Sequence, residues 1–233
     1  MAASLAHPSK PFTGDDLHRI DVFLNGGRDY VQGTQMIARA AEILPGGLAE
    51  TAILTTAAFK KITRNKILCL RGDAAPPEGL ALIGDAGFRK DGETLTLRFA
   101  ELVEPAERRD LPENVAYEPL GMLKPDLCGD FAFAGLNSFE DLLVLIVQTV
   151  KAVHEAAGPG VHDIWFTGCR NAALPLAGPP MTAGKLTVRH LRLLGRAPLF
   201  QTMSAVDVEG AGGDTLSAIV TFAFQAPAFE LEG

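Results

Sequence analysis

The strongest constraint on the fold is a run of six consecutive aliphatic residues, 142–147, inside a segment with the features of one long helix. Ser138 and Asp141 precede the run with the spacing of a capping box in which Asp replaces Glu or Gln, and Gly-Pro-Gly at 158–160 follows it. We therefore predict a helix over 139–157. A helix that is apolar all round is enclosed by other elements, and a strongly curved antiparallel sheet would enclose it. An α+β sandwich with its helices on one face is the alternative.

The same order of elements is expected twice along the chain. A first helix is predicted from about Arg28 to Leu44, where apolar residues recur at steps of three and four and Pro-Gly-Gly at 45–47 follows. The strands expected after it lie at 52–59, 65–71, 80–89 and 94–103, with Asp91-Gly92 as a hairpin turn. The strands expected after the second helix lie at 164–167, 185–194, 199–208 and 215–225. This pattern predicts the α+β class.

A proline-rich stretch separates the two halves. It contains Pro105, Pro112, Pro119 and Pro125, which favour a long connection over regular structure. The predicted organisation is a mobile N-terminal arm at 1–15, a first unit at 16–104, a connection at 105–137 and a second unit at 138–233.

Composition narrows the function classes. The chain has 233 residues, 47% of them hydrophobic, which excludes a largely disordered chain, and its net charge of −7 argues against non-specific binding to nucleic acid or to an anionic membrane. The longest aliphatic run is far shorter than the roughly 20 residues of a membrane span, and no secretory signal is evident. Cys69, Cys128 and Cys169 lie far apart, so neither a disulfide framework nor a metal site is expected. A cytoplasmic location follows by elimination.

The segment before the first helix carries a resemblance. Residues 24–37, L-N-G-G-R-D-Y-V-Q-G-T-Q-M-I, resemble the entry to the helix of the β-hydroxyacyl-thioester dehydratases of the hot-dog superfamily, where the pattern is roughly H-F-x-G-x-P-x-x-P-G. Gly27, Gly33, Met36 and Ile37 fall on matching positions. Together with the repeated order of elements, this resemblance to hot-dog dehydratases and thioesterases implies two tandem hot-dog-like units, a double hot dog. Each unit would be a long helix wrapped by a curved antiparallel sheet.

The catalytic pair of that superfamily is not matched. Its histidine would fall on Leu24 and its helix carboxylate on Ala38, and neither residue can transfer a proton. The resemblance still implies a tunnel between the halves for an acyl thioester of coenzyme A or of an acyl carrier protein. Coenzyme A or phosphopantetheine would then enter as part of the substrate, with no separate cofactor. In such folds the amides at a helix N-terminus face the thioester carbonyl. A homodimer of this chain is a further possible assembly.

Polar residues at the predicted start of the first helix are the first candidate site. Tyr30 could donate a hydrogen bond or act as an acid, and Asp29 could act as a base. The alternative is that Asp29 caps the helix and Tyr30 packs at the edge of the sheet. The substrate-binding residues expected around this pair are Asn25, Gly27, Arg28 and Gly33.

A basic cluster is the second candidate. Lys60, Lys61 and Arg64 are predicted to dock the phosphates of coenzyme A or the acidic surface of a carrier protein. The alternative is an exposed strand end, where Lys is common. A carboxylate from Glu140 or Asp141 is a weaker option, and His154 is expected to be a packing residue.

Two function classes therefore remain. The first is an enzyme acting on acyl thioesters, as a hydrolase, a hydratase or dehydratase, or an acyltransferase. The second is a non-catalytic hot-dog protein that binds a ligand or serves as a structural subunit.

Overall fold

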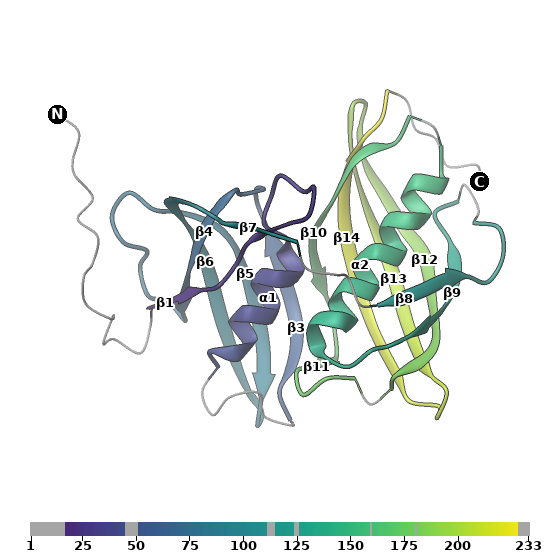
Figure 1. The fold of residues 1–233 in the computed structure, drawn as a ribbon, viewed down its shortest axis with the longest axis horizontal. Coiled ribbons are helices and arrows are strands. Elements are labelled where there is room, and N and C mark those ends of the chain that lie inside the picture. The colour runs from purple at the N-terminus through teal and green to yellow at the C-terminus, as the bar shows by residue number, and fades with distance from the viewer. Residues whose placement is uncertain are drawn as a thin grey trace.

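The computed structural model describes residues 17–44, 51–110, 115–123, 126–158, 160–179 and 181–227, so the predicted arm at 1–15 lies outside the described residues. Two helices and fourteen strands make up this part of the chain (Figure 1). The first half contains β1 (Leu17–Ile20), β2 (Leu24–Asn25), α1 (Gly33–Glu42), β3 (Ile53–Phe59), β4 (Asn65–Arg71), β5 (Ala81–Lys90), β6 (Glu93–Pro105) and β7 (Arg108–Arg109). The second half contains β8 (Ala116–Pro119), β9 (Gly129–Ala134), α2 (Phe139–Ala156), β10 (His162–Arg170), β11 (Leu174–Pro175), β12 (Ala183–Arg196), β13 (Leu199–Gly210) and β14 (Thr215–Gln225).

One continuous antiparallel sheet joins the two halves. Its strands follow the order β1-β4-β6-β5-β3-β10-β14-β13-β12-β9-β8, with the short β11 also paired to β3. Figure 1 shows α1 and α2 side by side in front of this sheet. The halves meet where β3 pairs with β10, at Ala57 opposite Cys169 and Ala58 opposite Gly168. Gly168 has a φ of +152°, and a Cβ on it would lie 2.2 Å from the carbonyl oxygen of Ala57, so the join requires glycine there.

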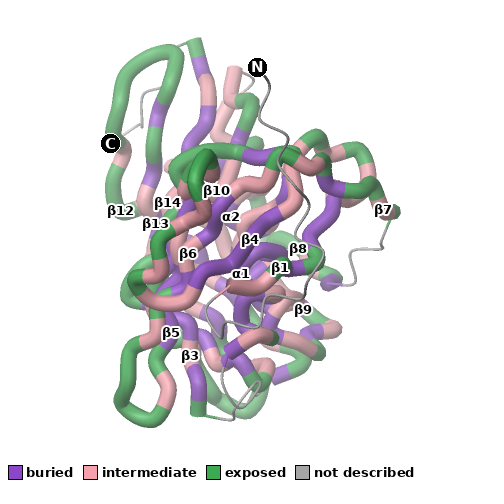
Figure 2. Tube along the Cα trace, turned by 90° about the vertical axis from the view of Figure 1, so that its left-hand side faces the viewer, coloured by how far each residue is buried: buried purple, intermediate pink, exposed green. Residues whose placement is uncertain are grey.

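The second helix is buried on most of its sides, so the prediction of an enclosed helix is confirmed in part. It spans Phe139–Ala156, and the Ser138 hydroxyl accepts a hydrogen bond from the Asp141 amide at 3.0 Å. Side chains on several sides of α2 are buried. Figure 2 shows that buried segments occur in the helices as well as in the strands. Val144 and Val147, from the aliphatic run, are only half-buried. The part of α2 that carries these two valines is therefore not fully covered by the sheet.

Most predicted strands are present with small shifts in their ends. The strands at 65–71 and 215–225 coincide with β4 and β14. The hairpin between β5 and β6 turns at Asp91 and Gly92, whose φ values of 50° and 83° are both positive, as a type I′ turn requires.

The predicted connection at 105–137 was interpreted incorrectly in part. β7, β8 and β9 all lie within it, and β9 pairs with β12 as a member of the main sheet. Two of the prolines are compatible with this because they stand at strand ends: Pro105 ends β6 and Pro119 ends the edge strand β8. Phe131 and Phe133 alternate into the core along β9.

The first helix begins later than predicted, at Gly33 instead of Arg28. The residues before it are held in an extended and turned conformation, because β2 forms a short parallel pair with β7 and Gly26 adopts a φ of +57°. Buried Gln35 adds to this by accepting a hydrogen bond from the Phe23 amide at 2.7 Å.

The two halves differ in how the order of strands in the sheet relates to their order along the chain. Counting outward from the join, β3 is followed by β5, β6, β4 and β1, whereas β10 is followed by β14, β13, β12 and β9. In the first half, the strand next to β3 is therefore β5, the third strand after α1. In the second half, the strand next to β10 is β14, the last of the described strands.

Candidate functional site

A cavity of about 200 Å³ lies where the two halves meet. Four parts of the fold form it: the N-terminus of α1 with the residues before it, the end of β3 with the loop that follows, one side of α2, and β10 with residues of β13 and β14. Its lining residues are Arg28, Tyr30, Val31, Gln32, Gly33, Thr34, Met36, Phe59, Lys60, Lys61, Ile62, Val144, Val147, Gln148, Lys151, Ile164, Trp165, Phe166, Thr167, Gln201 and Phe222.

The lining changes from apolar to polar between the interior and the surface. The buried lining residues are Val31, Met36, Ile164 and Phe222, together with Thr34. The exposed lining residues are Lys60, Lys61, Ile62 and Gln201. The cavity thus has an apolar depth and a largely polar mouth, as a site for an amphipathic ligand has.

Every charged residue among the described lining is cationic. Arg28, Lys60, Lys61 and Lys151 supply these charges, in a chain whose net charge is −7. Lys151 forms an ion pair with Glu155 at 3.4 Å. The mouth is therefore suited to an anionic group.

Lys61 is anchored beside the mouth by a partly buried carboxylate. It forms an ion pair with Glu101, which also accepts from the Thr63 hydroxyl at 2.6 Å and from the Asn65 amide at 3.1 Å. Burial raises the pKa of Glu101, but these hydrogen bonds outweigh burial and lower its pKa overall.

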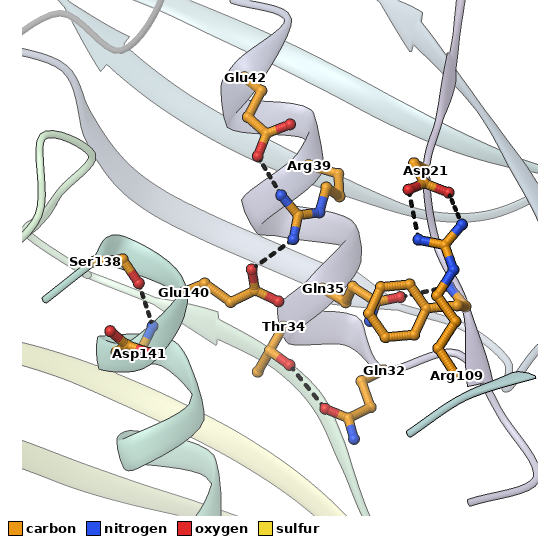
Figure 3. Close-up of polar contacts among 11 residues, drawn as sticks. Asp21, Gln32, Thr34, Gln35, Arg39, Glu42, Arg109, Ser138, Glu140 and Asp141 are labelled. Atoms are coloured by element: carbon orange, nitrogen blue, oxygen red, sulfur yellow. Dashed lines mark hydrogen bonds and ion pairs between the residues drawn. The ribbon is translucent and has the colours of Figure 1, made fainter. Parts of the chain in front are cut away.

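The N-terminus of α1 lies at the cavity, with Gln32, Gly33 and Thr34 among its lining residues. Gln32 is the N-cap residue, and its side chain makes no capping hydrogen bond. One atom of its amide lies 3.4 Å from the Thr34 hydroxyl (Figure 3), and the other lies 3.0 Å from Nε of Arg28. The first amides of a helix have no partner inside the helix, so they remain available to a ligand. By contrast, Ser138 caps α2.

Glycine at the start of α1 is required by packing. A Cβ on Gly33 would lie 2.6 Å from Cε2 of Phe59 and 3.1 Å from Cδ1 of Phe166. The helix therefore begins directly against two aromatic rings that line the cavity.

Comparisons with solved structures bear on the fold. A tesB protein of Mycobacterium avium subsp. paratuberculosis superposes with a TM-score of 0.52 at 10% identity, covering 92% of this chain and 95% of that one. A conserved protein of unknown function with a hot-dog fold from Alicyclobacillus acidocaldarius superposes with a TM-score of 0.51 at 11% identity, covering 86% and 89%. This chain has a hot-dog fold. No protein-family model and no curated protein matches its sequence.

The hot-dog fold brings only some of the predicted residues to the cavity. Those that line it are Tyr30, Arg28, Gly33, Lys60 and Lys61. Asn25, Gly27, Asp29 and Arg64 are not among its lining residues. The predicted site residues are therefore divided between those that line the cavity and those that lie outside it.

Asp29 takes part in surface ion pairs. Its side chain is 72% exposed, and it pairs with Arg108 at 3.3 Å and with Arg64 at 3.8 Å. The alternative that Asp29 caps α1 is wrong, because the helix begins at Gly33 and its N-cap is Gln32, three residues after Asp29.

Several lining residues were missed by the sequence analysis. Val144, Val147, Gln148 and Lys151 recur at helical spacing along one side of α2, so the signal was a polar pair on an otherwise apolar helix. Trp165, Phe166 and Thr167 line the cavity as consecutive residues of β10. This departs from strand alternation because the pairing of β10 with β14 shifts register on both sides of 165–166.

The carboxylates, imidazoles and thiols of the described residues do not line the cavity. None of its described lining residues is a histidine, aspartate, glutamate or cysteine. Glu140 is half-buried and bonds Arg39 of α1 at 2.9 Å, as Figure 3 shows. Burial raises the pKa of Glu140, although Arg39 acts against this rise. Asp141 accepts from the amide of Asn137 at 3.0 Å, which completes the cap of α2.

His154 is a packing residue, as expected. It is fully buried and stacks on Phe222, with ring centroids 5.5 Å apart. Its Nδ1 donates to the Val150 carbonyl and its Nε2 accepts from the Thr202 hydroxyl, both at 2.7 Å. Burial lowers its pKa to about 4, so the ring is neutral at physiological pH.

Neither a membrane helix nor a metal centre is found in the described residues. No described helix is both long and apolar enough to cross a bilayer. Within the same residues, no group of three or more His, Cys, Asp or Glu side chains is placed to hold a metal ion.

Proposed function

We propose that this chain binds an acyl thioester of coenzyme A or of an acyl carrier protein in the cavity between its two helices. One observation carries the proposal: the cavity is apolar in its depth, and the charged residues that line it are all cationic. An acyl thioester has the complementary chemistry, because an apolar chain is joined through a polar arm to phosphates.

The architectural part of the proposal is that the chain consists of two tandem hot-dog-like units, 16–104 around α1 and 138–233 around α2. The mainly antiparallel sheet and its continuous join at β3 and β10 support this arrangement. Because β9 pairs with β12, the second unit also includes β9, which precedes α2 in the chain. The cavity then lies at the junction of the units.

Each part of the ligand has a counterpart in the cavity. Phosphate oxygens meet Lys60, Lys61 and Lys151, whose ammonium groups form charge-assisted hydrogen bonds. The thioester carbonyl meets the N-terminus of α1, where the helix dipole favours negative charge. The acyl chain enters the apolar depth, and each methylene removed from water contributes about 0.8 kcal/mol.

Catalysis on the same ligand is the second candidate. The observation that favours it is that Tyr30 and the uncapped N-terminus of α1 line one cavity. The amides would stabilise an oxyanion, and the Tyr30 hydroxyl would donate a proton or a hydrogen bond. Binding requires fewer groups than catalysis does, and the lining holds no carboxylate or imidazole among its described residues. Binding is therefore the function that the geometry supports best.

A paired assay tests the two candidates. Hexanoyl-CoA is added to the protein, and the melting temperature and the release of free thiol are both measured. Binding predicts a concentration-dependent rise in melting temperature, because a ligand that binds only the folded state stabilises it. Thiol release that is lost in Tyr30→Phe supports catalysis. Absence of both stabilisation and thiol release with acyl-CoA and acyl carrier protein contradicts the proposal.

A further inference from the structure

We infer that the cavity selects acyl groups of about eight carbons or fewer, and that a wall made by Phe59, Phe166 and Phe222 sets this limit. The inference rests on the proposed function, since it concerns the acyl part of the same ligand. All three phenylalanines line the cavity.

The three rings form a continuous surface across the join of the sheet. Phe59 of β3 and Phe166 of β10 have centroids 5.9 Å apart, and Phe166 and Phe222 of β14 have centroids 5.7 Å apart. Rings at these distances are in contact, so no methylene chain passes between them.

The wall is backed by the core on both sides. Phe59 stacks on Phe99 at 5.9 Å, and Phe222 stacks on His154 at 5.5 Å. Phe99 and His154 are both fully buried. A ligand that reaches the rings therefore meets packed interior, not a further channel.

Phe59 is also fixed in its place by two glycines. A Cβ on Gly33 of α1 would lie 2.6 Å from Cε2 of the ring, and a Cβ on Gly84 of β5 would lie 2.8 Å from Cδ1. The ring fills the space that these missing side chains leave.

The volume in front of the wall limits the acyl group. An apolar cavity of about 150 Å³ holds a benzene molecule of six carbons. On that scale the cavity of about 200 Å³ holds at most about eight carbons, because any part of the polar arm that enters the cavity occupies some of the same volume. A longer chain would have to fold back toward the mouth, where Lys60, Lys61 and Lys151 lie.

The test uses S-alkyl coenzyme A thioethers from ethyl to hexadecyl, which cannot be hydrolysed, with affinity measured by titration calorimetry. The affinity of the unchanged protein is expected to rise about fourfold per methylene up to about eight carbons. It is then expected to stop rising or fall. A steady rise through the hexadecyl ligand would overturn the inference.

Two cavity variants and one control locate the limit. Phe222→Ala is expected to move the preferred chain several carbons longer, whereas Val147→Phe, which fills the cavity from α2, moves it shorter. Phe200→Ala is the matched control: Phe200 is also buried and stacks on Phe224 at 5.5 Å, but it is not among the lining residues. An unchanged profile in Phe222→Ala would overturn the inference. If that variant does not fold, an unchanged profile in Val147→Phe decides in the same way.

The two proposals fail in different ways. If coenzyme A, every thioether and acylated acyl carrier protein leave the unchanged protein without a binding signal, the proposed function itself is wrong. If the ligands bind with no preferred length, only the inference about the wall is wrong.

Discussion

The first residue of α1, Gly33, lies so close to Phe59 that a Cβ on the glycine would come within 2.6 Å of the ring. This approach joins the N-terminus of the helix to the aromatic wall of the cavity. The start of the helix proposed to face the thioester and the rings proposed to limit the acyl chain are therefore placed by one packing contact.

Gly33→Ala tests this contact. The new methyl group would displace the ring of Phe59, which also packs closely against Gly84 of β5. We expect a loss of about 1–3 kcal/mol in the free energy of unfolding, as is typical of overpacking. Urea denaturation measures it. The double variant with Phe59→Leu, which shortens the ring, should recover part of the loss, and no recovery would contradict the proposed clash.

The cationic mouth predicts a selective effect of charge reversal. Lys60→Glu should weaken coenzyme A binding by about 1 kcal/mol, or about fivefold in Kd, since exposed charge interactions are modest. The effect should shrink as salt is added. The control is Arg196→Glu, which changes the net charge equally at an exposed strand end outside the cavity. Equal weakening in both variants would indicate a general charge effect and contradict docking at the mouth.

His154 predicts a loss of stability in mild acid. Burial lowers its pKa from 6.5 to about 4, so the unfolded chain binds a proton there before the folded chain does. Stability is therefore complete above about pH 6.5 and declines toward pH 4. The full shift corresponds to about 3 kcal/mol.

The histidine contribution is isolated by difference, because His190 also has a pKa lowered by burial. His154→Gln removes one titrating group and leaves the other. Urea denaturation at pH 7 and at pH 4.5 should show a smaller acid loss in the variant than in the unchanged protein. Identical losses would show that the His154 ring does not titrate as its burial requires.

The ion pair between the helices predicts a pH-dependent substitution. Arg39→Ala leaves the half-buried Glu140 without its 2.9 Å partner, and we expect a loss of about 1–3 kcal/mol in the free energy of unfolding at pH 7. The loss should be smaller near pH 4, because a carboxyl group with a raised pKa accepts a proton there and no longer needs the guanidinium.

A surface ion pair supplies the control for Arg39. Arg189→Ala removes a more exposed pair with Asp207 and should cost about 0.5 kcal/mol or less. Equal costs in the two variants would show that the contact between the helices has no special role.

Local signals account for the parts of the fold that the sequence predicted well. The start of α2 is signalled locally by Ser138, Asp141 and the aliphatic run that follows them. The hairpin between β5 and β6 is likewise signalled by Asp91-Gly92. The two halves place different strands beside the join: β5, followed by β6, in the first half, and the last strand β14, followed by β13, in the second. This difference could not be predicted, because periodicity identifies a strand but not its neighbour in the sheet. The strand β9 was hidden between prolines, although Phe131 and Phe133 carried the alternation.

The candidate site was predicted only where its residues are close in sequence. Arg28, Tyr30 and Gly33 stand together, as do Lys60 and Lys61, and both groups line the cavity. Gln148, Lys151 and Trp165 join them only through tertiary packing, and the bulge in β10 that presents Trp165 has no signature in the alternation of the strand.

The most direct test of the central claim uses Trp165, the single tryptophan of the chain, which lines the cavity. S-hexyl coenzyme A is titrated into the protein while the fluorescence of this tryptophan is followed. We predict a saturable change whose midpoint moves to higher concentration in Lys60→Glu but not in Arg196→Glu. A fluorescence signal that stays constant, together with an unchanged melting temperature at the highest ligand concentration, would contradict binding in the cavity.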